Sequence, residues 1–280
     1  MDLSTALLRT ALNATALASP RLAGRAAFEV FCRPLRRSRV RSAERELHAL
    51  AVTERLAVDG KTVTAYRWGD GARPVLLVHG WQSRASRFAP LIPGLRALGL
   101  TPVSFDAPGH GDSGGRATNL IEVRALIGQL HDRYGPFEAV VAHSFGVTCT
   151  FAALRDGVKA DRLVAIAGVS EFAFLPAEFR RQLGLGPWAE RELGRRIARL
   201  LPAGQGLDTL DATYRPADLG LPILAVHDED DPTAPLAQAR RLQDAYGEQL
   251  QLITTRGLGH RRILGEPAVV DNVLGFLGAE

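Results

Sequence analysis

One short apolar segment constrains the fold of this chain more than any other, because it stops abruptly at a serine. The run Val140-Val141-Ala142 is typical of a buried strand, and an apolar run typical of a helix begins after Ser144-Phe145-Gly146. The small residues Ala142 and Gly146, two positions before and after Ser144, let strand and helix pass close together, which lifts the hydroxyl out of a sheet. The pattern A-H-S-F-G therefore favours Ser144 as a nucleophile. Patterns this short also occur by chance, so the assignment of Ser144 as a nucleophile depends on the residues elsewhere in the chain.

A serine that acts as a nucleophile needs a base to take its proton and an acid to orient that base. Two further apolar runs typical of strands, 222–226 and 250–254, are followed by residues of both kinds. The first run precedes a cluster of carboxylates that includes Asp231, 87 residues after Ser144. The second precedes His260, 29 residues after Asp231. Parallel strands would deliver all three side chains to the carboxyl edge of one sheet, where open α/β sheets bind their ligands.

In this order of motifs the chain resembles the α/β-hydrolase superfamily, in particular its serine esterases and lipases, from about Val52 to the C-terminus. The order nucleophile, acid, histidine is that of the family. The resemblance implies an α/β fold with a mostly parallel sheet, helices on both faces and a small helical cap. Four motifs carry it: V-L-L-V-H-G-W at 75–81, D-A-P-G-H-G-D-S at 106–113, the serine elbow at 142–146, and the acid and histidine loops.

The resemblance also implies a role for each residue of the site. Ser144 would attack a carbonyl carbon, His260 would accept and return its proton, and Asp231 would orient the imidazole. The backbone N–H groups of Trp81 and Phe145 would form the oxyanion hole. The side chain of Trp81 need not take part and is expected in the wall of the site. We predict no metal and no other cofactor, because the spacing of histidines and cysteines fits no zinc site.

The acid loop leaves alternatives open. Asp230 leaves the same strand end as Asp231 and could orient the histidine in its place. The family pattern G-x-x-D-x-x-x-P favours Asp231, although Asp228 stands where the pattern has glycine. The clustered carboxylates could instead bind a cation, but they lack the alternating ligands and central glycine of an EF-hand. The six other histidines are interpreted as loop or surface groups, with His79 and His143 near the site.

Length and composition indicate one large core. The chain has 280 residues, of which 46% are hydrophobic, and this suits one α/β domain with an insertion. We expect a basic helical extension over 1–50 and a hydrolase domain over 51–280, with a cap inserted at about 169–220. The apolar cap residues either line a substrate pocket or hold the cap to the body; they are Phe172, Phe174, Leu175 and Trp188. The expected strands are a hairpin around 59–60 and the runs 75–79, 101–105, 137–142, 163–167, 222–226 and 250–254.

Positive charge is concentrated in the first 50 residues, which hold nine arginines against four carboxylates. Because the whole chain has a net charge of +4, residues 51–280 are close to neutral, and we expect no nucleic-acid partner. Phe28, Val30, Phe31 and Leu35 are interleaved with the arginines. Two interpretations stay open: a helix that makes peripheral contact with an anionic membrane, or a helix packed on the hydrolase body. No apolar run reaches the about 20 residues of a membrane span.

The two cysteines form no disulfide framework, which favours a reducing cytoplasm. With only two lysines, the Arg-, Ala-, Leu- and Gly-rich composition is typical of a bacterial protein from a GC-rich genome. The expected function is a serine hydrolase that cleaves a carboxylic ester, or a related acyl bond, of a small-molecule substrate through an acyl-enzyme. A carbon–carbon bond hydrolase or an acyltransferase could use the same triad, because fold and triad do not choose the leaving group. A ligand-binding protein of this fold without turnover is the third alternative.

Overall fold

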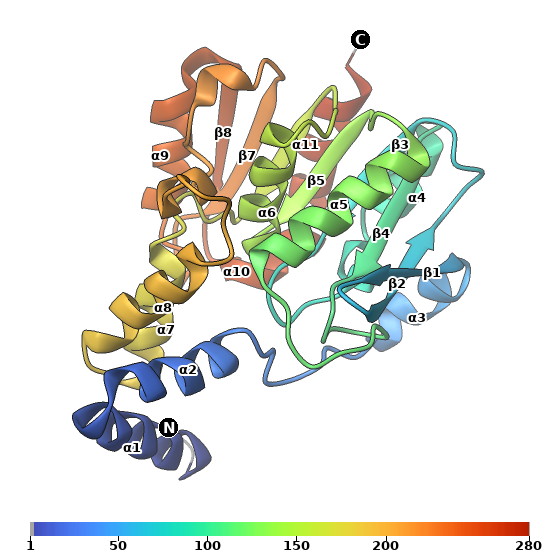
Figure 1. Cartoon of the computed structure of the whole chain (residues 1–280). Coiled ribbons are helices and arrows are strands. Elements are labelled where there is room, and N and C mark those ends of the chain that lie inside the picture. The colour runs from blue at the N-terminus through green and yellow to red at the C-terminus, as the bar shows by residue number, and fades with distance from the viewer. Residues whose placement is uncertain (1–2, 280) are drawn as a thin grey trace.

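Eight strands form a single sheet with the order β1-β2-β4-β3-β5-β6-β7-β8, in a computed structural model that describes residues 3–279 (Figure 1). Two residues of the expected extension, 1–2, and the last residue of the expected hydrolase domain lie outside the described residues. The strands are β1 (Val52–Val58), β2 (Lys61–Arg67), β3 (Pro74–Val78), β4 (Thr101–Asp106), β5 (Ala139–His143), β6 (Leu163–Ile166), β7 (Ile223–Asp228) and β8 (Leu250–Thr255). The hairpin β1–β2 and the pair β2–β4 are antiparallel, and the remaining pairs are parallel.

Alternate side chains of the central strands enter two cores, one on each face of the sheet. Five helices cover these cores: α4 (Ile92–Ala97), α5 (Leu120–Tyr134), α6 (Phe145–Arg155), α9 (Ala237–Tyr246) and α11 (Pro267–Gly278). Leu76 and Val140 belong to the core under α5, α6 and α9, whereas Leu77 and Val141 belong to the core under α4 and α11. Burial on both faces explains why these strands are continuous apolar runs in the sequence.

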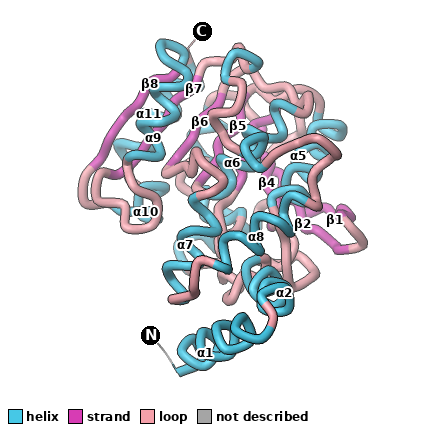
Figure 2. Tube along the Cα trace, turned by 60° about the vertical axis from the view of Figure 1, so that its left-hand side comes forward, coloured by secondary structure: helices cyan, strands magenta, loops and turns pink. Residues whose placement is uncertain are grey.

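A further group of helices lies beyond the edge of the sheet at which β5, β7 and β8 end (Figures 1 and 2). Two of them, α7 (Phe174–Leu183) and α8 (Trp188–Ala198), are inserted between β6 and β7. The N-terminal helices α1 (Leu3–Ala18) and α2 (Pro20–Phe31) pack on this pair, with α2 against α8. A small apolar cluster that includes Leu12, Ala27 and Leu183 joins them. The helix α3 (Ser42–Ala49) lies away from this group, beside β2, where Trp68 Nε1 donates to Leu47 O at 2.8 Å.

The predicted fold class is confirmed, and the hairpin and the six other predicted strands are found within two residues of their expected bounds. The largest differences have local causes. Phe137, the expected start of β5, makes only an isolated bridge with Ala160. The strand β7 extends past 226 because His227 and Asp228 still pair with β8. Among residues 3–279, no helix combines the length and the hydropathy that a bilayer-spanning segment requires.

Candidate active site

Ser144 lies at the sharp turn between β5 and α6, and its backbone is held in a conformation that L-residues rarely adopt. Its φ angle is 56°, in the left-handed region, where a side chain other than that of glycine is strained. The Ser144 N–H donates to Ile166 O of the neighbouring strand at 2.9 Å, which ties the turn to the sheet. The residue is only 8% exposed. The sequence pattern A-H-S-F-G thus forms the strained strand-to-helix turn that it predicts.

Two glycines allow the backbone to pass close to this turn. A Cβ on Gly146 would lie 2.6 Å from Val78 O, so the first turn of α6 can approach β3 only without a side chain at that position. A Cβ on Gly80 would lie 2.8 Å from Ser144 Cβ, so the loop after β3 can approach the serine only through glycine. Ala142, which replaces the first glycine of the usual pattern, is fully buried in β5 and fits with its methyl group.

The three residues Ser144, His260 and Asp231 form a continuous chain of hydrogen bonds. His260 lies in the short helix α10 (Gly259–Arg262), directly after the loop that follows β8. Its Nδ1 is 2.7 Å from Asp231 Oδ2, and its Nε2 is 2.8 Å from Ser144 Oγ. With Nδ1–H donating to the carboxylate, Nε2 is left as the acceptor of the serine proton. The site therefore aligns a hydroxyl, an imidazole and a carboxylate through two consecutive hydrogen bonds.

Asp231, and not its neighbour Asp230, is the carboxylate that contacts the histidine. The second oxygen of Asp231 accepts hydrogen bonds from Thr233 N at 2.7 Å and Ala234 N at 3.0 Å. Burial disfavours the charged carboxylate, but these hydrogen bonds and that of His260 outweigh it and lower the pKa of Asp231. Asp230 turns the other way and accepts from Gly257 N at 3.2 Å.

Asp228, at the position where the family pattern has glycine, connects the acid loop with the histidine loop. Its Oδ1 accepts from Asp230 N at 3.1 Å, while its Oδ2 accepts from Thr255 Oγ1 at 2.8 Å and Leu258 N at 3.0 Å. Burial again opposes the charge, but the backbone N–H groups that it accepts from lower the pKa of Asp228. Sequence reasoning identified only the departure from the pattern and missed this bracing role.

The expectation that the other histidines are loop or surface groups is wrong for His143 and His227, which are buried strand residues of β5 and β7. His79 and His110 do lie in loops, but they are buried as well. His143 Nε2 donates to the backbone carbonyl of His260 at 2.8 Å. His227 Nε2 donates to Ala234 O at 2.8 Å, behind the carboxylate of Asp231. Burial lowers the pKa of His143 to about 3 and also lowers the pKa of His227. Both are therefore neutral donors that hold the loops carrying Asp231 and His260 in place.

Two backbone amides next to Ser144 are available for a ligand. The N–H of Phe145 is the first of α6, where helix geometry leaves no intrahelical acceptor. Neither this amide nor that of Trp81 donates a hydrogen bond to another residue within 3–279. The Trp81 ring packs edge-on against Phe145, with 5.7 Å between the ring centroids, and it lines the cavity as expected of a wall residue.

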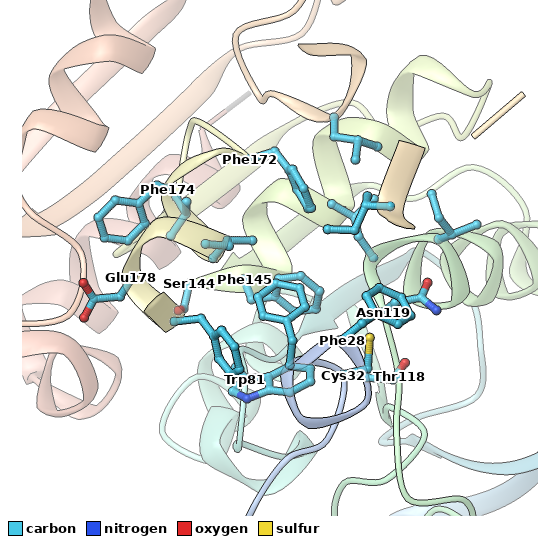
Figure 3. Close-up of a pocket in the computed structure, with 18 of the residues that line it drawn as sticks. Phe28, Cys32, Trp81, Thr118, Asn119, Ser144, Phe145, Phe172, Phe174 and Glu178 are labelled. Atoms are coloured by element: carbon cyan, nitrogen blue, oxygen red, sulfur yellow. The ribbon is translucent and has the colours of Figure 1, made fainter. Parts of the chain in front are cut away.

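A mainly apolar cavity of about 190 Å³ opens above Ser144, Phe145 and Trp81 (Figure 3). Three of the four cap residues singled out in the sequence line it, whereas Trp188 instead donates from Nε1 to Asn13 of α1 at 3.1 Å. The N-terminal extension supplies part of the wall, which sequence reasoning did not foresee. The apolar lining comprises Phe28, Phe31, Leu120, Ile121, Val169, Phe172, Phe174, Leu175, Phe179, Ile197, Leu200 and Leu210.

Within residues 3–279, no group of three histidine, cysteine or carboxylate side chains is arranged to hold a metal ion. The carboxylates after β7 are instead used by hydrogen bonds to the backbone and to His260. The chemistry available to the site is therefore that of a hydroxyl nucleophile activated by an imidazole, beside two amide donors and an apolar cavity.

Comparison with known proteins points to one family and one fold. A family model described as "Alpha/beta hydrolase family" matches residues 75–273, while no curated protein matches the sequence significantly. Three solved structures illustrate the likeness. Alpha/beta hydrolase domain-containing protein 10 from mouse has a TM-score of 0.63 and 17% identity, over 81% of this chain and 97% of its own.

The second is a monoacylglycerol lipase of Paleococcus ferrophilus, with a TM-score of 0.59 and 21% identity, over 77% of this chain and 98% of its own. The third, from a study of carboxylesterases of the thaumarchaeon Nitrososphaera gargenis, has a TM-score of 0.61 and 16% identity, over 80% of this chain and 97% of its own. At these identities the likeness establishes the fold.

Proposed function

The chain belongs to the alpha/beta hydrolase family, and from this premise we propose that it is a serine hydrolase that cleaves a carboxylic ester through an acyl-enzyme. One observation carries the proposal: the hydrogen-bonded chain from Asp231 through His260 to Ser144 ends beside two amides that have no other acceptor among the described residues. A protein that only binds a ligand has no physical need for this alignment. The lipase and carboxylesterase among its structural neighbours support an ester as the substrate.

The proposed reaction has two halves. Ser144 Oγ attacks the ester carbonyl while its proton moves to His260 Nε2, and the developing oxyanion is bound by the N–H groups of Trp81 and Phe145. Collapse of the tetrahedral intermediate breaks the carbon–oxygen bond, and the departing alcohol takes the proton from His260. Water then attacks the acyl-enzyme with His260 as base, which releases the acid and restores the serine.

We propose that the acyl part of the substrate is apolar, because the cavity above Ser144 is lined mainly by aromatic and aliphatic side chains. In this proposal α7 and α8 act as the cap of a hydrolase domain over 51–280, and α2 of the extension completes the wall with Phe28 and Phe31. The two cysteines are free and buried thiols, which supports action in a reducing compartment such as the cytoplasm.

The test uses a short-chain p-nitrophenyl ester and a fluorophosphonate probe with the full chain. We expect probe labelling and ester turnover in the natural sequence, no labelling in Ser144→Ala, and turnover about four to six orders of magnitude lower in both Ser144→Ala and His260→Ala. The exposed Ser42→Ala variant serves as the matched control and should keep both signals. Labelling that persists in Ser144→Ala, or an absence of turnover and labelling in the folded natural sequence, would exclude the serine mechanism.

A further inference from the structure

Four arginines converge on one cavity outside the candidate active site. The cavity of about 290 Å³ lies between α2 and α8, and its lining consists of Arg21, Glu192, Arg195, Arg196 and Arg199. Among residues 3–279, Glu192 is the only carboxylate in this lining, and it is bonded to Arg195. Arg196 donates to Arg21 O at 3.1 Å, while its buried Nε has no partner within residues 3–279.

This arrangement favours the binding of an anion. Guanidinium groups stay charged at any physiological pH, so the four side chains cannot relieve their mutual repulsion by losing a proton. One carboxylate leaves three positive charges around the cavity uncompensated. The planar N–H groups of arginine match the oxygens of a phosphate group, which would accept several hydrogen bonds at once. The cavity is therefore suited to a phosphate group.

Two exposed leucines flank one of these arginines, Arg21, in the sequence at the corner between α1 and α2. Leu17 is 92% exposed and Leu22 is 62% exposed, and Arg21 lies between them in the sequence. The helix α1 contains a single charged residue, Arg9, over residues 3–18. Both helices lie at an extremity of the molecule, below α7 and α8 in Figure 2. We call Leu17, Arg21, Leu22, Arg195, Arg196 and Arg199 the corner patch.

We propose that the corner patch docks on the surface of an anionic phospholipid membrane, where its guanidinium groups bind lipid phosphates and its two leucines enter the headgroup region. A lipid surface offers both chemistries side by side, whereas free phosphate offers nothing to the leucines. A second copy of this chain fits poorly because two positively charged patches repel each other. The patch thus specifies a membrane rather than a soluble anion or a dimer partner.

Docking would also bring the proposed substrate pocket close to a source of apolar acyl groups. The 12-residue helix α2 carries Arg21 and Leu22 in its first turn, and Phe28 and Phe31 of its last turns line the cavity above Ser144. This consequence rests on the proposed function, whereas docking itself does not.

The experiment measures co-sedimentation of the full chain with vesicles of phosphatidylcholine alone and with 30% phosphatidylglycerol. We expect pelleting with the anionic vesicles at low salt, at least about tenfold weaker binding to the neutral vesicles, and release at high salt because charges are screened. Arg195→Gln with Arg199→Gln should weaken binding about fivefold per charge. Leu17→Glu with Leu22→Glu should weaken it at least tenfold. The matched controls are Leu50→Glu, at a site 66% exposed, and Arg240→Gln on α9, and both should bind like the natural sequence.

Turnover of a water-soluble ester, measured in parallel without vesicles, should be the same in all these variants, so a failure of docking is distinguishable from a failure of the proposed chemistry. Binding that is equal for neutral and anionic vesicles, or unaffected by the patch variants, would overturn the proposal. Thermal stabilisation by inorganic phosphate that Arg195→Gln abolishes, without pelleting, would replace it with a soluble anion site. A dimer in sedimentation velocity that Leu17→Glu dissolves, again without pelleting, would replace it with a self-association surface.

Discussion

At the residue scale, two adjacent carboxylates occupy different environments after the same strand. Asp231 is buried and uses its oxygens for His260 and for two backbone amides, whereas Asp230 reaches only the N–H of Gly257. A shift of one residue in this turn would exchange them. The bracing of Asp230 N by the Asp228 carboxylate at 3.1 Å fixes the register and keeps Asp231 on the inside.

This difference predicts unequal effects for the same change at neighbouring positions. In Asp231→Asn the amide cannot hold His260 in the tautomer that accepts the serine proton, so kcat for a p-nitrophenyl ester should fall about 10⁴-fold. Asp230→Asn should stay within about twofold of the natural sequence, because it does not touch the histidine. The measurement is steady-state kinetics of both variants after far-UV circular dichroism has verified folding. Equal losses in both variants would contradict the assignment of Asp231.

His143 is predicted to act as a positioning residue. Its Nε2–H donates to the carbonyl of His260, and its low pKa keeps it a neutral donor. His143→Leu removes the donor and leaves that carbonyl without its buried partner. The misaligned His260 should raise the activation free energy by about 1 to 1.5 kcal/mol and thereby lower kcat about tenfold. KM should stay nearly unchanged because His143 does not line the cavity. The variant His143→Gln, which retains an N–H donor, should recover part of the loss; a rise in KM at constant kcat would indicate a binding role instead.

At the element scale, α2 connects the extension to the candidate site. Its residues Phe28 and Phe31 line the cavity, and Phe31 packs edge-on against Phe179 of α7 with 5.3 Å between ring centroids. An element that precedes the first strand thereby shapes the space above a serine in the middle of the chain. The cavity depends on the packing of the extension as well as on the cap.

We predict that Phe28→Ala changes the preference for acyl length. Removing the ring takes away apolar surface worth about 1 to 2 kcal/mol to a bound acyl chain, so KM for a hexanoyl ester should rise about tenfold. The enlarged cavity should at the same time favour longer chains. The measurement is kcat/KM for p-nitrophenyl esters from acetyl to dodecanoyl. Leu35→Ala, at an exposed position of the same segment, is the control, and an identical acyl profile in Phe28→Ala would refute the wall role of α2.

The sequence predicts the sheet well because each central strand is a continuous apolar run buried on both faces, and such runs have few alternative structures. It predicts which side chains meet at the carboxyl edge for the same reason. The sequence cannot show what α2 packs against, because a helix with apolar residues interleaved with arginines could bind a membrane or a protein surface equally well. The prediction for His227 was wrong because a histidine followed by three carboxylates is typical of a loop. In the structure, His227 pairs with β8 and the strand β7 continues past it.

At the scale of the whole molecule, four neutral histidines are buried along or near the carboxyl edge of the sheet. Burial lowers the pKa of His110 and of His143 to about 3 in each case, and it also lowers the pKa values of His79 and His227. His110 stays within the fold as a neutral acceptor, with Gln82 N donating to its Nε2 at 3.1 Å. The native state therefore resists the uptake of protons that the unfolded chain accepts readily.

This resistance predicts a loss of stability in mild acid. Histidine in an unfolded chain has a pKa of about 6.5. Between that value and the lower native pKa the unfolded state binds more protons, so the free energy of unfolding falls as the pH falls. His110 and His143 should each lower the free energy of unfolding by on the order of 2 kcal/mol as the pH falls from 8 to 5. This window lies above the range in which unfolded carboxylates, with pKa values of about 4, bind protons.

Urea unfolding at pH 8, 6.5 and 5 measures the effect, with constant m-values as a check that the transition keeps the same character. His110→Gln offers an oxygen to Gln82 N in place of Nε2 but does not titrate. It should therefore lose about 2 kcal/mol less than the natural sequence between pH 8 and pH 5, even where its stability at pH 8 is lower. A free energy of unfolding that is flat over this range, or an equal decline in His110→Gln, would show that the buried histidines do not govern the acid sensitivity of the fold.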